Sequence, residues 1–247
     1  LFWAVWPERQ LELLVLYSKY LVLMFVTYRI LQTEREIKLF LWAHVLGCFF
    51  LGWTAYESHT GGRFEDFGGS DIGEANSGAL TLATGAFAVG VLFLVGKWKE
   101  RIPLVLISPF ILDGIIRTVS RSASLALASG GVVFNLYTPV LFRRLVRWLS
   151  VLAAILFLIL TNSVYWTRLD TVTAMGAEVE GQDTGSGRFV IMAAQIKMFK
   201  AIPMGSGHRG TAYYSPIYLP DEMLTGLGES RARSSHNTFM SFLVEQG

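Results

Sequence analysis

Long hydrophobic runs separated by short polar connections make up the first two thirds of the chain. Each run approaches the ~20 residues with which a helix crosses the hydrocarbon core of a membrane. Six runs lie at residues 10–31, 39–57, 79–96, 102–118, 122–142 and 148–166. A further run begins near Thr238, and residues 1–6 are interpreted as the tail of an earlier span that Pro7 stops, within a longer protein. The pattern predicts an all-α, polytopic membrane helix bundle.

Basic residues mark every second connection between these runs. Because short cytoplasmic loops collect lysine and arginine, those connections are predicted to face the cytoplasm. The basic residues are Arg35 and Lys38, then Lys97, Lys99 and Arg101, then Arg143, Arg144 and Arg147. The alternate connections then face outward, and among them only 167–235 is large enough for a small helical loop domain. We therefore expect a bundle over 1–166, this extracytoplasmic loop over 167–235, and the start of another transmembrane helix over 236–247.

Composition supports a membrane protein and excludes other classes. Hydrophobic residues make up 52% of the chain and charged residues 16%, whereas soluble domains have about 25% charged residues. The net charge of +2, with scattered basic residues, predicts no nucleic-acid partner. A single cysteine, Cys48, excludes an internal disulfide, and the four histidines lack metal-ligand spacing. We therefore expect neither a metal nor a cofactor.

Three ionisable residues lie where charge is costly. Asp113 and Arg117 occur within one apolar run at i,i+4 spacing, where a mutual ion pair is the expected arrangement. Arg121 lies in a predicted outer turn, Ser120-Arg121-Ser122, without a nearby acidic residue. Its side chain either binds an anion or extends to the lipid headgroups.

Arg188 begins a second candidate anion site. Residues 184–187 are typical of a helix cap, and an apolar stripe of Phe189, Met192, Ile196 and Phe199 then predicts a helix up to Lys200. The positive end of a helix dipole repels a cation such as Arg188. An anion bound by the arginine and the free backbone N–H groups would remove that repulsion; an exposed arginine of small cost is the alternative.

His236 is the candidate base. It follows Ser234 and Ser235, which are good N-cap residues, and precedes a helical pattern of apolar residues. In the first turn of a helix, the dipole would favour the neutral imidazole, which can accept a proton. A purely structural histidine is the alternative.

The order of these motifs resembles the O-antigen ligase family of bacterial polytopic membrane proteins. The first matching elements are Ser120-Arg121, in the turn between two spans on the outer side, and Arg188 at the start of a loop helix. They are followed by the Pro203-Met204-Gly205-Ser206-Gly207 turn and by His236-Asn237 with nine residues before Gly247. Asn76 with Ala79 is similar to another family element, more loosely. The family pattern continues to a further glycine beyond Gly247.

The resemblance implies an inverting, metal-independent glycan transfer on the periplasmic face of the bacterial inner membrane. The donor would be a glycan on undecaprenyl diphosphate, and the acceptor a hydroxyl of lipid A core or another glycan. Catalytic roles are implied for His236, Arg121 and Arg188: the histidine as base, the arginines on the diphosphate. Substrate binding is implied for both arginines, Asn237, Gly205 and Gly207, with membrane lipids as surroundings.

Other functions agree with parts of the sequence. A polysaccharide polymerase or a protein O-oligosaccharyltransferase of the same family would differ only in its acceptor. A transporter would use the intramembrane Asp113 and Arg117 and a helix broken at Gly130-Gly131, but we find no inverted repeat in the sequence. A scaffold without chemistry of its own is the third alternative.

Overall fold

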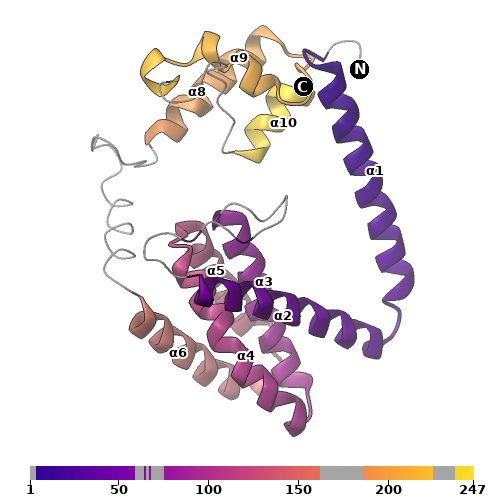
Figure 1. Ribbon diagram of the computed structural model, residues 1–247, viewed down its shortest axis with the longest axis vertical. Coiled ribbons are helices and arrows are strands. Elements are labelled where there is room, and N and C mark those ends of the chain that lie inside the picture. Colours follow the sequence, from indigo (N-terminus) through magenta and orange to yellow (C-terminus); the bar gives the residue numbers. More distant parts are fainter. Residues whose placement is uncertain (1–3, 59–63, 65–66, 68–74, 162–185, 225–236) are drawn as a thin grey trace. The chain divides into compact units, whose positions relative to one another are not determined.

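In the computed structural model, all regular structure within the described residues is helical (Figure 1). The structure describes residues 4–58, 64, 67, 75–161, 186–224 and 237–247. The chain divides into two compact units, one made of Leu1–Arg29 with Thr171–Gly247 and the other of Ile30–Asp170. The predicted all-α helical class is confirmed. The predicted functional division at residues 166 and 235 stays a prediction.

The unit Ile30–Asp170 contains five α-helices within its described residues. They are α2 (Glu34–Glu57), α3 (Ala75–Val95), α4 (Trp98–Arg117), α5 (Arg121–Tyr137) and α6 (Arg143–Leu160), with a short 3-10 turn, η1 (Val140–Phe142), before α6. Each of the last five predicted runs overlaps one of these helices, and residues 162–166 of the last run lie outside the described residues. The connections from α3 to α4, residues 96–97, and from α4 to α5, residues 118–120, are short.

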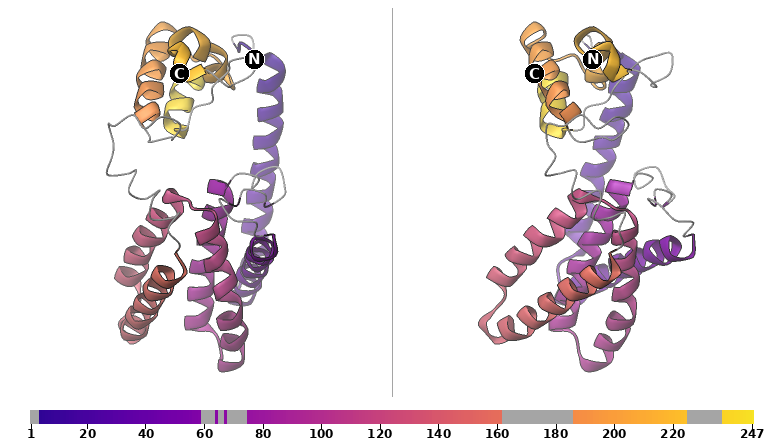
Figure 2. Two further views of the ribbon diagram at one scale, coloured as in Figure 1. Left: turned by 60° about the vertical axis from the view of Figure 1, so that its left-hand side comes forward. Right: turned by 90° about the vertical axis from the view of Figure 1, so that its left-hand side faces the viewer.

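Small residues allow α2, α3 and α4 to pack closely side by side (Figure 2). A Cβ atom added at Gly52 of α2 would overlap the Phe110 carbonyl of α4, and one added at Gly85 of α3 would overlap Cys48 of α2. Such close approach is typical of helices that associate in membranes, where packing replaces hydrophobic burial as the driving force. The fully buried side chains of Val45, Leu82, Leu104 and Ile111 fill the space between these helices.

Local chemistry explains where two of these helices begin or end. Thr33 caps α2, because its hydroxyl accepts from the Glu36 N–H while the Glu36 carboxylate accepts from the Thr33 N–H at 2.8 Å. The predicted run to residue 142 breaks after Tyr137. Pro139 lacks an N–H and disfavours helical backbone at Thr138, so the chain turns there before α6.

The second unit joins the N-terminal helix to the C-terminal segments. It contains α1 (Pro7–Ile30), α8 (Ser186–Ala201), α9 (Gly210–Tyr218), η2 (Asp221–Leu224) and α10 (Thr238–Gln246). α8, α9 and α10 pack on one another around the buried residues Ile191, Ala194, Met198, Leu219 and Val244. The N–H of Val5 donates to the Ser206 carbonyl at 2.9 Å, which ties the chain just before α1 to this cluster.

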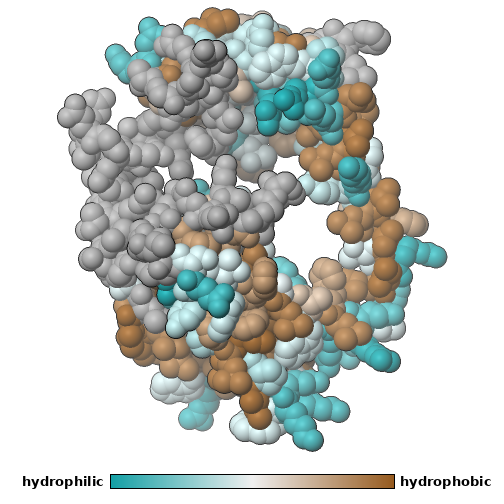
Figure 3. All heavy atoms as spheres, viewed as in Figure 1, coloured by the Kyte–Doolittle hydropathy of each residue, from teal (hydrophilic) through white to brown (hydrophobic). Residues whose placement is uncertain are grey.

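The protein is a membrane protein by helix length and surface. Within the described residues, α1, α2 and α3 are both long and apolar enough to cross a bilayer. Helix α4 contains charged residues near both ends, which lower its hydropathy. The apolar part of α5, Ser122–Tyr137, is shorter than these three helices. Hydrophobic side chains cover much of the surface that these helices expose (Figure 3).

Candidate functional site

Arg121 is the first residue of α5. Its N-cap is Ser120, whose hydroxyl accepts from the Ala123 N–H at 3.4 Å. The first turn of α5 contains no acidic residue. The backbone of Arg121 therefore stands at the positive end of a helix dipole, where a cation is unfavourable by about 0.3–1 kcal/mol unless an anion is close. The sequence predicted a turn at this position, and the structure adds the helix terminus.

The turn that leads into α5 is buried and strained. Thr118, Val119 and Ser120 expose 0%, 4% and 2% of their surface. Val119 has a φ of +48°, a left-handed conformation that costs a β-branched residue about 1–3 kcal/mol. The Ser120 hydroxyl donates to the Asn76 side-chain oxygen of α3 at 2.8 Å. Asn76 and the Ser120-Arg121 turn, two elements of the family resemblance that are far apart in sequence, are therefore in contact.

Asp113 and Arg117 form the ion pair that their spacing predicts. Both side chains are largely buried, at 22% and 16% exposure. The Arg117 guanidinium also lies over the Tyr56 ring, 5.5 Å from its centroid, and the Arg117 carbonyl accepts from the Phe64 N–H at 3.0 Å. These contacts give the pair a structural role at the end of α4.

Arg188 lies in the first turn of α8, which begins at Ser186. As in α5, this turn contains no acidic residue. The predicted helix is confirmed. Of the apolar stripe that predicted it, Phe189 and Ile196 are 61% and 41% exposed. The buried face is Ile191, Ala194, Gln195 and Met198. Packing against α9 and α10 selects this face, because the helix is apolar on more than one side.

The Pro203–Gly207 turn covers the C-terminal end of α10. The N–H groups of Ser206 and Gly207 donate to the Val244 and Glu245 carbonyls at 3.0 and 2.8 Å, and the Ser206 hydroxyl donates to Val244 at 2.9 Å. These are carbonyls that lack intrahelical partners at a helix end. Gly205 and Gly207 have φ of +84° and +82°, and a Cβ atom at either would meet backbone within 2.8 Å. Both glycines are therefore required by the turn itself; their predicted substrate-binding role stays a prediction.

The spacing of the His236-Asn237-x9-Gly247 element is the length of α10. Asn237 is the N-cap, its side-chain oxygen accepting from the Met240 N–H at 3.2 Å, and Gly247 is the C-cap with a φ of +91°. Asn237 therefore has a structural role as a cap, and its implied substrate-binding role stays a prediction. The expectation that Ser234 or Ser235 caps this helix is wrong, because Asn237 has the extended backbone and the side-chain bond of an N-cap. His236 itself lies outside the described residues. Because it precedes the N-cap Asn237, the prediction that it belongs to the first turn of this helix is wrong.

Sequence reasoning missed a contact between Glu245 and His208. The Glu245 carboxylate, 13% exposed, lies 3.5 Å from Nδ1 of His208 and accepts from the backbone N–H groups of Arg209 and Thr211 at the start of α9. The N–H of His208 donates to the Gln10 side chain of α1 at 2.7 Å. Glu245 thereby joins the end of α10 to the start of α9, and the His208 N–H joins the same segment to α1.

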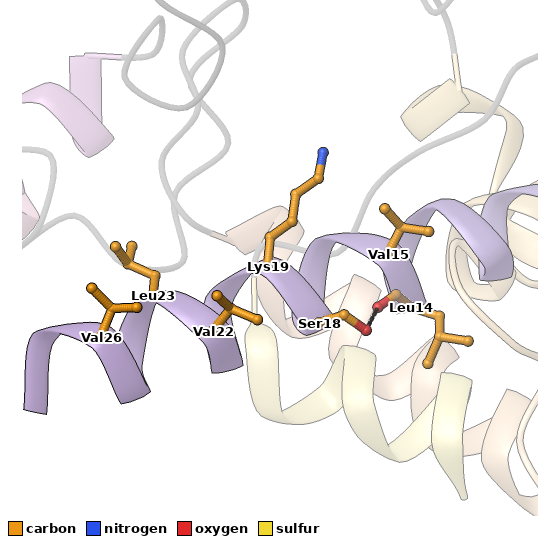
Figure 4. A pocket seen from close by; sticks show the side chains of 7 residues that line it. All are labelled: Leu14, Val15, Ser18, Lys19, Val22, Leu23 and Val26. Atoms are coloured by element: carbon orange, nitrogen blue, oxygen red, sulfur yellow. Dashed lines mark hydrogen bonds between the residues drawn. The ribbon is translucent and has the colours of Figure 1, made fainter. Parts of the chain in front are cut away.

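A shallow groove of about 550 Å³ runs along α1 (Figure 4). Its lining is Leu14, Val15, Ser18, Lys19, Val22, Leu23 and Val26. The Ser18 hydroxyl is used within the helix, donating to the Leu14 carbonyl at 2.8 Å. Lys19 is the only charged residue of this lining, and none of the predicted site residues belongs to it. Within the described residues, no group of three or more His, Cys, Asp or Glu side chains could hold a metal ion.

The sequence matches the family model described as O-antigen ligase over residues 104–247, which is more than half of the chain. The chain belongs to the O-antigen ligase family. No curated protein and no solved structure matches it. Members of this family are glycosyltransferase-like ligases or polymerases.

The O-antigen ligase region includes all the predicted site residues. It begins within α4, covers Arg121 and Arg188 at their helix starts, and ends with the turn and α10. Asn76 lies before it and reaches the site through Ser120. The turn and α10 form one described structure, whereas Arg121 lies in the other unit.

Proposed function

We propose that this protein transfers a glycan from undecaprenyl diphosphate to an acceptor hydroxyl at the periplasmic face of the bacterial inner membrane. In this reaction the hydroxyl oxygen bonds to the anomeric carbon of the donor sugar. The bond between that carbon and the diphosphate oxygen breaks, and undecaprenyl diphosphate leaves with the bonding electrons. Attack from the opposite face inverts the anomeric configuration, and the hydroxyl proton passes to a base.

One observation carries the proposal: both predicted arginines lie in the first turn of a helix that has no acidic residue there. Arg121 opens α5 and Arg188 lies third in α8. A cation is disfavoured at each position, and an anion at each would be attracted by guanidinium and helix dipole together. The leaving diphosphate is such an anion, and it gains negative charge as the bond to the sugar breaks.

Each residue then has a separate part in the chemistry. A guanidinium can contact phosphate oxygens in forked geometry, so Arg121 and Arg188 stabilise the leaving group electrostatically. His236 accepts the proton of the attacking hydroxyl, a contribution worth typically about 10²- to 10⁴-fold in rate. Asn237, the next residue in the sequence, caps the start of α10.

The arrangement of helix ends supports the proposed sidedness. The Asn76–Ser120 and Phe64–Arg117 hydrogen bonds lie at the ends of α3, α4 and α5. The basic residues predicted to be cytoplasmic, such as Lys97, belong to the opposite ends of α3 and α4. The chain just before α1 contacts the Pro203–Gly207 turn, because the Val5 N–H donates to the Ser206 carbonyl.

Transfer by purified protein from a defined undecaprenyl-diphosphate glycan tests the proposal. Lipid A core, a second glycan chain and a protein acceptor, supplied separately, would distinguish a ligase from a polymerase or a protein O-oligosaccharyltransferase. Arg188→Lys should lose most activity although it keeps the charge, because an ammonium group cannot form the forked contact. Arg144→Lys, at an exposed arginine of α6, is the matched control and should transfer normally. Equal activity of both variants would contradict the assigned role of Arg188.

The two arginines should also act on one leaving group. If so, Arg121→Ala combined with Arg188→Lys should cost less than the sum of the single losses. Strictly additive losses would separate the two residues into independent sites.

A further inference from the structure

The Ser120 hydroxyl links α3 to the start of α5 through its hydrogen bond with Asn76. A hydroxyl has one proton, and Ser120 gives it to the Asn76 side-chain oxygen at 2.8 Å. Ser120 also lies 2.9 Å from the Ser122 hydroxyl, which must therefore be the donor of that pair. The oxygen of the Ser120 hydroxyl also accepts a hydrogen bond from the Ala123 N–H. The bond to Asn76 thus leaves the Ser120 hydroxyl oxygen as the acceptor in its other two contacts, with Ser122 and Ala123.

This bond acts on a strained segment directly before Arg121. Val119 is held at a φ of +48°, and its N–H donates to the Ile116 carbonyl at 2.9 Å. On the other side of Val119, Ser120 is anchored to Asn76. A strained residue persists only where its surroundings hold it, and Asn76 provides one of these contacts from a separate helix.

The packing of α3 against α5 has other support. Farther along the two helices, Phe87 and Phe134 lie with ring centroids 6.2 Å apart, and a Cβ atom at Gly130 would overlap the Phe87 ring. These apolar contacts hold the helices together in the hydrophobic part of the bundle. The Asn76–Ser120 bond, at the helix ends, instead constrains the turn.

We propose that Asn76 is a positioning residue for Arg121: through Ser120 it holds the left-handed turn at Val119 and with it the first residue of α5. This inference rests on the proposed function, in which Arg121 contacts the diphosphate. Asn76 acts on the substrate only through the arginine. Removing the Asn76 side chain should therefore matter while Arg121 is present and cease to matter once Arg121 is gone.

A double-mutant cycle on donor affinity tests this. The probe is undecaprenyl diphosphate, titrated into the purified full chain in lipid nanodiscs. Asn76→Ala should weaken its binding about three- to tenfold, the range that one net hydrogen bond supports. In an Arg121→Ala background, where Arg188 still binds the diphosphate, the same change should weaken binding less than about twofold.

Three results would count against the proposal in different ways. Equal effects of Asn76→Ala in both backgrounds would mean that Asn76 only stabilises the bundle, and would overturn it. No effect of Asn76→Ala beside a clear effect of Arg121→Ala would also overturn it but leave the proposed function standing. No effect of Arg121→Ala would contradict the proposed role of Arg121 itself. Ser129→Ala, which removes a hydroxyl bonded only within α5, is the control and should bind normally.

Discussion

Replacing Gly205 by alanine should detach α10 from the turn that covers its end. At a φ of +84° an added Cβ atom would lie 2.7 Å from the Gln246 carbonyl carbon and 2.7 Å from the Glu245 oxygen. Neither contact involves a flexible side chain, so the backbone of the turn or of α10 must move. The hydrogen bonds from Ser206 and Gly207 to α10 would be lost with that movement.

The expected destabilisation follows from these contacts. Left-handed backbone costs a non-glycine residue about 1–2 kcal/mol. Three hydrogen bonds join the turn to the Val244 and Glu245 carbonyls, and each contributes a net of about 1 kcal/mol. Together they indicate a loss on the order of 4–5 kcal/mol for the docking of α10, enough to undock a helix of nine residues.

Hydrogen exchange measured by mass spectrometry tests the prediction. Amides of α10 should exchange at least about 100-fold faster in Gly205→Ala, while amides of α3 and α4 keep their protection. Gly131→Ala is the control, since a Cβ atom there meets nothing within 4 Å and alanine favours a helix by up to about 1 kcal/mol. Unchanged protection of α10 in Gly205→Ala would refute the structural reasoning, and lost transfer alongside it would instead favour the substrate-binding role of Gly205.

Two further predictions concern sidedness and the base. A cysteine placed at Asp183 should react with an impermeant thiol reagent from the outer side, and one at Lys99 should not; the reverse pattern would place the site in the cytoplasm. His236→Ala should abolish transfer while keeping donor binding, whereas His208→Ala should cost far less, because the contacts of His208 with Glu245 and Gln10 are structural. In the intact protein, transfer should fall as the pH falls and the imidazole takes up a proton; a His236→Ala variant with normal transfer would remove the base from the mechanism.

Local patterns in the sequence were sufficient to predict the helices and one ion pair. Apolar runs of membrane length have few alternatives to a helix, because a bilayer leaves no water to satisfy backbone groups. The Asp113–Arg117 pair follows from i,i+4 spacing within a single helix. The start of α5 at Arg121 depends on the adjacent N-cap, Ser120, which is also local.

Only the tertiary structure decided which motifs touch. Asn76 and Ser120 are 44 residues apart, and Ser206 and Val244 are 38 apart. The nine-residue spacer before Gly247 reads as a motif in the sequence, and the structure gives its length a cause: a short helix capped at both ends. The buried face of α8 could not be predicted from the sequence either, because packing against α9 and α10 decides which of its two apolar sides is buried. Periodicity describes the spacing of apolar residues within one segment. The residues that pack against a helix face or bond to a turn belong to distant segments, and the local pattern contains no information about them.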